Sequence, residues 1–130
     1  NKMNLQSKTV VVNKSGTDLY DHINELKNLY GLMPENVERF EADEDTFLFG
    51  MKGLPDVRLL LHEKERPRFM RFKSASSKLD FMLTAQIKDL GETSELHFDF
   101  EGNFNAMMKM MVERPLKNFI EELAANAAKL

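Results

Sequence analysis

The sequence predicts one α+β domain in which a curved antiparallel sheet of seven strands wraps around a long C-terminal helix. Three observations predict this class. Successive segments between residues 35 and 103 alternate apolar and polar residues, as half-buried strands do. Short turns join these segments, which favours antiparallel neighbours. Residues 106–130 instead carry apolar side chains at helical spacing.

The first strand and a helical segment open the chain. Leu5 to Asn13 is rich in β-branched residues and reads as a strand. Ser15 and Asp18 fit a Ser-x-x-Asp capping box, so a helix should begin there. Apolar residues then recur at three- and four-residue spacing, at Leu19, Ile23, Leu26 and Tyr30. Gly31 and Pro34 end this stretch, which is either one helix or two short helices with a break near Asn24.

Six further strands follow, separated by turns rich in Gly, Pro, Asp and Ser. They are Val37 to Ala42, Thr46 to Lys52, Asp56 to Glu65, Arg68 to Ser74, Lys78 to Asp89 and Ser94 to Gly102. Within each strand the apolar residues share one face and the intervening residues are mostly polar, which predicts a sheet with one face exposed to solvent.

The C-terminal segment, Ala106 to Leu130, is predicted to be one long amphipathic helix. Pro115 lies inside it and should kink it, because proline removes a hydrogen bond and clashes with the preceding turn. The predicted apolar stripe is Met107, Met108, Met111, Leu116, Phe119, Ile120, Leu123 and Ala127.

The composition limits the possible functions. Apolar residues make up 42% and charged residues 30% of the 130, which is typical of a single globular domain spanning residues 1–130. A net charge of -3 argues against nucleic-acid binding, which needs a surplus of Lys and Arg. Cysteine is absent, which excludes disulfides and thiol chemistry. The absence of cysteine fits a cytoplasmic protein, and no segment is apolar enough to span a membrane, so we expect no integral membrane association.

The order strand, helix pair, six antiparallel strands and long helix resembles the helix-grip fold of the START-like superfamily, also called SRPBCC, which includes polyketide cyclase/dehydrase-like proteins. The resemblance covers the whole chain. It is carried by the strand Leu5 to Asn13, the turn Leu29-Tyr30-Gly31-Leu32-Met33-Pro34-Glu35 and the segment Glu113-Arg114-Pro115-Leu116-Lys117-Asn118-Phe119. It implies a cavity between the sheet and the last helix, which relatives use for lipids, sterols, polyketides or other apolar molecules.

The candidate ligand-binding residues are therefore the inward-facing apolar side chains, with Arg71 as a possible anchor for a ligand carboxylate. They are Phe49, Met51, Leu59, Leu61, Phe72, Phe81, Leu83, Phe98, Phe100, Met107, Met108, Met111 and Arg71. The alternative is that the Met and Phe side chains form ordinary core. The strand register also leaves two choices open: either Met70 and Phe72 point inward, or Phe69 and Arg71 do.

Nothing in the sequence predicts a metal, a cofactor or a catalytic group. His22, His62 and His97 lack metal-ligand spacing. His97, Asp99 and Glu101 alternate with apolar residues and belong on the outer face of the sheet.

Three functions follow from these predictions. The first is non-catalytic binding or transport of a small apolar or amphipathic molecule. The second is a protein-interaction module on the same fold. Whatever its function, the chain is expected to be a monomer or weak dimer. The third is a polyketide cyclase-like enzyme, which needs polar side chains that converge inside, from candidates such as Arg71, Ser74, Thr84 and Tyr30.

Overall fold

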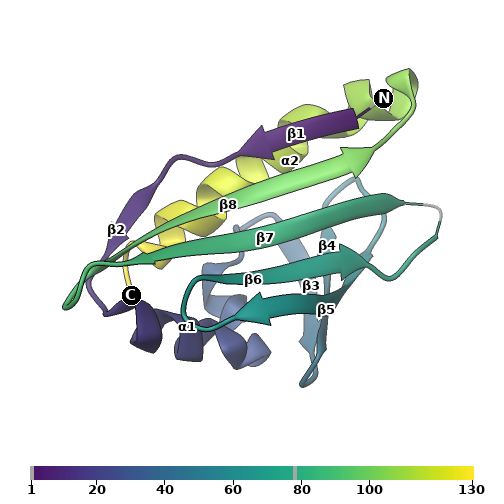
Figure 1. The fold of residues 1–130 in the computed structure, drawn as a ribbon. Coiled ribbons are helices and arrows are strands. Elements are labelled where there is room, and N and C mark those ends of the chain that lie inside the picture. Colours follow the sequence, from purple (N-terminus) through teal and green to yellow (C-terminus); the bar gives the residue numbers. More distant parts are fainter. Residues whose placement is uncertain (1, 78) are drawn as a thin grey trace.

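The computed structural model describes residues 2–77 and 79–130 and has the predicted α+β architecture (Figure 1). Its elements, in chain order, are β1 (Lys2–Gln6), β2 (Val10–Val12), α1 (Gly16–Asn24), the 3-10 helix η1 (Leu26–Leu32), β3 (Val37–Ala42), β4 (Thr46–Met51), β5 (Val57–Glu65), β6 (Phe69–Ser74), β7 (Asp80–Asp89), β8 (Ser94–Asn103) and α2 (Ala106–Ala127).

The strands form one antiparallel sheet in the order β1-β8-β7-β6-β5-β4-β3, and the short β2 pairs with β8 beyond the end of β1. Figure 1 shows the sheet curving, with α2 running behind β1 and β8. The last helix contacts β8, β1, β2 and η1. The predicted arrangement, a curved antiparallel sheet around a long C-terminal helix, is confirmed.

The later strands lie within two residues of their predicted bounds, because alternation and turn residues mark them clearly. The predicted first residue of β7, Lys78, lies outside the described residues. The register also decides the question left open for β6. Met70 pairs with Ala85 and Phe72 with Leu83, so Met70 and Phe72 point inward.

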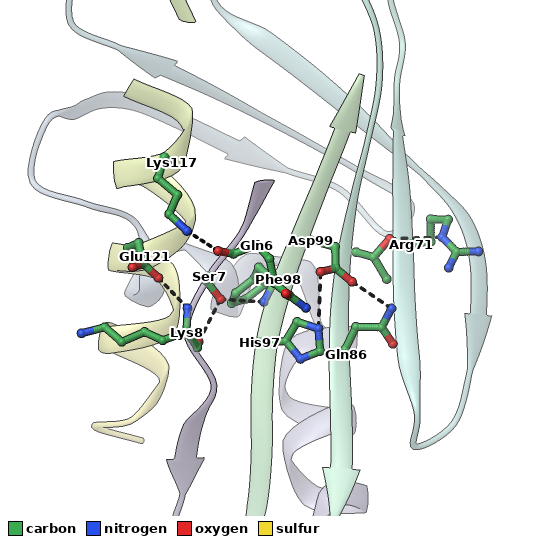
Figure 2. Close-up of polar contacts among 11 residues, drawn as sticks. Gln6, Ser7, Lys8, Arg71, Gln86, His97, Phe98, Asp99, Lys117 and Glu121 are labelled. Carbon is green, nitrogen blue, oxygen red and sulfur yellow. Dashed lines mark hydrogen bonds and ion pairs between the residues drawn. The ribbon is translucent and has the colours of Figure 1, made fainter. Parts of the chain in front are cut away.

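The first strand is interrupted, which corrects the prediction of one strand from Leu5 to Asn13. The regular strand pairing with β8 ends at Gln6 and resumes at Val10, although the Ser7 N–H still donates to the Phe98 carbonyl at 2.9 Å. At the break, the Ser7 hydroxyl accepts a hydrogen bond from the Phe98 backbone N–H at 2.8 Å. The side chain therefore replaces a backbone partner in the ladder, as Figure 2 shows.

Two side chains of α2 complete the hydrogen bonding at this break (Figure 2). Lys117 Nζ donates to the Gln6 carbonyl. Glu121 Oε1 accepts from the Lys8 backbone N–H at 2.6 Å. These contacts fasten the middle of α2 to the edge of the sheet and satisfy backbone groups that an interrupted strand leaves free.

The helical segment after β2 is two helices with a break after Asn24, one of the two alternatives predicted. Ser15 Oγ accepts from the Asp18 N–H at 3.1 Å and so caps α1 as expected. The Gly16 N–H donates to Asp89 Oδ1 at 2.9 Å, which ties α1 to the β7–β8 turn. Hydrogen bonds from the backbone N–H groups of Gly16 and Gly91 hold the pKa of the Asp89 carboxyl below its ordinary value.

The two halves of α2 are anchored very differently. The Asn105 side chain caps the helix by accepting from the Met108 N–H at 2.8 Å, and the helix continues through Pro115 to Ala127, three residues short of its predicted end. All its buried side chains follow Pro115: Leu116, Phe119, Ile120, Leu123, Ala124 and Ala127. The first half is therefore held by partly buried residues alone.

The core fills the space between the concave face of the sheet and the helices. The opposite face carries His97, Asp99 and Glu101, as predicted from their alternation. One buried side-chain polar atom in the described part of the chain has no hydrogen-bond partner, the hydroxyl of Ser94. None of the described helices is both long enough and apolar enough to cross a membrane.

Candidate functional site

An apolar pocket of about 90 Å³ lies between the concave face of the sheet and the part of α2 from Met108 to Phe119. Strands β4, β5, β7 and β8 and helix α2 all contribute to its walls. Its fifteen lining residues are Phe49, Met51, Leu54, Pro55, Val57, Leu59, Leu79, Phe81, Leu83, Phe100, Phe104, Met108, Val112, Leu116 and Phe119. None of them carries a charged or hydrogen-bonding side chain.

Aromatic rings form two opposite walls. On one side Phe49 of β4 stacks on Phe119 of α2, with ring centroids 4.6 Å apart and planes 9° from parallel. On the other side Phe81 of β7 and Phe100 of β8 have centroids 4.9 Å apart. Phe104 extends this second wall, with its centroid 6.4 Å from that of Phe100. These centroid distances, between 4.6 and 6.4 Å, lie in the range that aromatic pairs prefer, so ring contacts stabilise both walls.

A glycine makes room for the second wall. A Cβ added at Gly102 would lie 2.7 Å from Phe104 Cε2 and 2.9 Å from Phe81 Cβ, closer than side chains normally approach. The missing side chain at this inward position of β8 therefore allows both rings to lie against the strand. The pocket depends in this way on a residue that does not line it.

One end of the pocket reaches the surface. Leu54 and Pro55, in the turn between β4 and β5, are partly or fully exposed. Opposite them, Met108 and Val112 of α2 are half-buried. The mouth therefore lies between a turn and the weakly anchored half of α2, where small movements of unbranched or short side chains can change its width.

Seven of the predicted ligand-binding residues line this pocket: Phe49, Met51, Leu59, Phe81, Leu83, Phe100 and Met108. Phe72 and Phe98 are buried elsewhere in the core, and Leu61 is half-buried against it. Some inward-facing residues of a strand therefore line the pocket, while others on the same face belong to the packed core.

The expectation that Met107 and Met111 face the interior is wrong. Met107 is 74% exposed and Met111 is 61% exposed. In a segment with Met at four of its first six positions, several helical faces are equally apolar, so spacing alone did not identify the buried face. The lining residues Met108, Val112 and Leu116 instead form the inward stripe, at intervals of four residues.

Arg71 lies outside the pocket, because the strand register is the one in which Met70 and Phe72 point inward. It pairs with Thr84 across β6 and β7, on the outer face of the sheet. Its Nε donates to Thr84 Oγ1 at 3.1 Å and its Nη1 donates to Glu63 Oε1 at 2.7 Å. Its guanidinium carbon stands 4.9 Å from the centroid of the Phe69 ring.

Arg71 belongs to a row of polar side chains on the outer face that Figure 2 shows. Gln86 Nε2 donates to Asp99 Oδ2 at 3.2 Å, and His97 Nε2 lies 3.4 Å from Asp99 Oδ1. These side chains therefore contact one another on the side of the sheet away from the pocket. Among the residues that the structure describes, no cluster of three His, Asp or Glu side chains could hold a metal ion.

The polar residues considered for catalysis do not converge. Thr84 and Arg71 face outward and Tyr30 is largely exposed, while the Ser74 hydroxyl donates to the Ser76 carbonyl. The pocket itself can thus exclude water and contact apolar groups, but its lining has no side chain that could hold or move a proton.

Eight lining residues were not among the predicted site residues: Leu54, Pro55, Val57, Leu79, Phe104, Val112, Leu116 and Phe119. Leu116 and Phe119 were on the predicted stripe, and their signal was correct. Leu54 and Pro55 were missed because the sequence identifies them only as turn residues. The fold places this turn at the pocket that α2 also lines.

Solved structures with this architecture are numerous, although no protein-family model and no curated protein matches the sequence. The chain is similar to KanY at 12% identity, with a TM-score of 0.80 and coverage of 99% of this chain and 97% of that one. It is similar to norcoclaurine synthase from Thalictrum flavum at 14% identity, with a TM-score of 0.73 and coverage of 99% and 92%.

A third similar structure is the di-domain aromatase/cyclase StfQ from the steffimycin biosynthetic pathway, at 11% identity and a TM-score of 0.74. The match covers 98% of this chain and 50% of StfQ. Identities this low carry information about fold alone. The common fold and the geometry described above agree with the resemblance in the sequence: this chain has the helix-grip fold of START-like, or SRPBCC, proteins.

Proposed function

We propose that this protein binds a small, uncharged apolar molecule in the pocket between the sheet and α2. The observation that carries the proposal is the wholly apolar lining of a pocket that reaches the surface at one end. Apolar cavities of this kind are not stabilised by water, so a hydrophobic guest gains both contacts and release from solvent. We further propose a cytoplasmic location, which the absence of cysteine supports.

The volume sets the size of the guest. At about 90 Å³, the pocket is smaller than the cavity of about 150 Å³ that accepts benzene in an engineered protein. A single small ring or a short alkyl chain therefore requires modest widening. Met108 and Val112 at the mouth are the side chains best placed to provide it, because they are half-buried and lie on the weakly anchored part of α2.

Binding without turnover is the form of this function that we favour. Apolar sites that also catalyse reactions place a few polar groups among apolar ones. Here all fifteen lining side chains are apolar, and the polar row that includes Arg71 and Asp99 lies on the other face of the sheet.

The test combines a small apolar probe with a variant that fills the pocket. Toluene should raise the unfolding temperature of the wild type in a concentration-dependent way, because a molecule that binds the folded state alone stabilises it. Val112→Phe should abolish this shift by filling the mouth. Met107→Phe adds the same ring to the exposed face of the same helix and should retain it.

The absence of any shift in the wild type, or a shift of equal size in Val112→Phe, would contradict the proposal. A second experiment, native mass spectrometry of protein purified gently from its own host, would identify the natural guest. A defined extra mass that disappears on denaturation, and that Val112→Phe lacks, is the expected result.

A further inference from the structure

A groove of about 840 Å³ lies between the outer edge of β1 and the exposed face of α2. Its walls include Asn4 and Gln6 on the strand and Met110, Arg114 and Lys117 on the helix. It shares no lining residue with the apolar pocket. The two sites therefore lie on different parts of the surface and can be tested separately.

The hydrogen bonds of β1 show which of its backbone groups face β8. The Ser7 N–H donates to the Phe98 carbonyl at 2.9 Å, so the backbone of Ser7 faces β8. Residues of an antiparallel strand alternate between groups that face the partner strand and groups that face away. Leu5 and Met3, at two-residue intervals, must then also bond to β8.

The residues between them face the groove. By the same alternation, the N–H and C=O groups of Lys2, Asn4 and Gln6 point away from β8. Lys117 confirms this direction, because its Nζ donates to the Gln6 carbonyl from the groove side. No described side chain bonds to the Asn4 N–H or C=O, which leaves a short edge of unpaired backbone groups facing the groove.

The helix side of the groove offers cationic and apolar groups. Met110 is 85% exposed. Arg114 is exposed and forms no ion pair or hydrogen bond with any residue that the structure describes. Glu113, the one carboxylate in the groove, lies 3.9 Å from the ammonium of Lys109. The groups left for a partner are therefore a guanidinium and a flexible thioether.

We propose that this groove binds an extended, acidic segment of a partner protein as an added strand beside β1. An exposed edge next to a helix is a common way to recognise extended peptides: backbone bonds supply affinity and side-chain contacts supply specificity. Backbone groups of the segment pair with those of Asn4, and one of its carboxylates pairs with Arg114. Its apolar side chains contact Met110.

The probe is a fluorescein-labelled nonapeptide of alternating Thr and Val in which two Thr are replaced by Glu, and binding is followed by fluorescence anisotropy. Arg114→Glu should weaken binding by at least about tenfold, since it turns an attraction into a repulsion. Lys129→Glu makes the same charge change beyond the end of α2 and should leave binding unchanged. A peptide with Lys in place of Glu should bind no better to the wild type than to Arg114→Glu.

Backbone pairing has a test of its own. The Asn4 amide proton should exchange quickly in the free protein and slowly in the complex, while the Leu5 amide is protected in both. Asn4→Pro should weaken peptide binding, because it removes an N–H that faces the groove and leaves the bonds to β8 intact.

The proposal is overturned if the peptide does not bind, or if it binds while the Asn4 amide stays unprotected and Arg114→Glu has no effect. Asn4 protection that grows with protein concentration in the absence of peptide would also overturn it, because the occupant would then be a second copy of this chain. Val112→Phe fills the apolar pocket and should not alter peptide binding, so failure of either proposal is distinguishable from failure of the other.

Discussion

Gly16→Ala tests the closest approach between α1 and the sheet. Gly16 is buried at the start of α1, and its N–H donates to the Asp89 carboxylate at 2.9 Å. A Cβ at this position would lie 2.6 Å from Asp89 Cβ and 3.0 Å from Asp89 Cα. Those atoms belong to, or lie next to, the backbone of the β7–β8 turn, so a change of rotamer cannot relieve the contact.

The expected magnitude follows from two opposing effects. Replacing Gly by Ala within a helix normally stabilises a protein by about 0.5–1 kcal/mol. Forcing an extra carbon into a packed site costs about 1–3 kcal/mol. The second effect is larger, and the shift that relieves the contact also lengthens the Gly16–Asp89 hydrogen bond. We therefore expect a net loss of about 1–2 kcal/mol in the free energy of unfolding.

Urea denaturation followed by circular dichroism measures this loss as a lower midpoint with an unchanged m-value. Gly31→Ala is the matched control, because an added Cβ there meets no atom within 4 Å. It should leave the midpoint unchanged or raise it slightly. Equal stability of Gly16→Ala and wild type, or an equal loss in Gly31→Ala, would refute the reasoning.

Three further predictions concern acid stability, buried hydroxyls and methionine. The hydrogen bonds that lower the pKa of Asp89 stabilise the folded state at pH values above the unfolded-state pKa of about 4. This stabilisation is lost as the pH falls through the lower pKa of the folded state. Asp89→Asn should thus lower the urea midpoint at neutral pH, and the difference in midpoint between wild type and variant should become smaller in acid. Ser94→Ala removes an unpartnered buried hydroxyl and should be neutral or stabilising by about 1 kcal/mol. Ser7→Ala leaves the buried Phe98 N–H without its acceptor and should cost about 1–3 kcal/mol. Effects of the opposite sign in thermal unfolding would contradict this reasoning. Met70→Ala should cost about 2–5 kcal/mol and Met110→Ala almost nothing in the same urea assay, because the first side chain is 0% and the second 85% exposed.

The strands could be predicted well from the sequence because their signals are local. Alternation in β7 and β8 and the turn residues between them depend on neighbours in the chain, and both strands have the expected inward faces. The break between β1 and β2 has no such signal. Residues on both sides of it favour strands, and the partner that replaces the ladder bond, the Phe98 N–H, is 91 residues away from Ser7.

The candidate site was harder to predict for the same physical reason. A strand face can be read from sequence, but which members of that face meet a cavity depends on how the sheet curves. Phe98 and Phe100 share a face of β8, yet only Phe100 lines the pocket. Arg71 was ambiguous because Phe69 and Met70 are both apolar, and only the pairing of β6 with β7 decides between them.

If the pocket binds a guest as proposed, the uneven anchoring of α2 would separate the affinity for that guest from the rate at which it exchanges. The second half of the helix is fixed by six buried side chains, whereas the half that borders the mouth has none. Opening of the first half thus requires little loss of buried surface and should occur far more often than global unfolding. The residence time of a guest would then follow the frequency of this local opening, while the equilibrium constant follows the aromatic walls. A substitution on the exposed side of the first turns could shorten residence time and leave affinity unchanged.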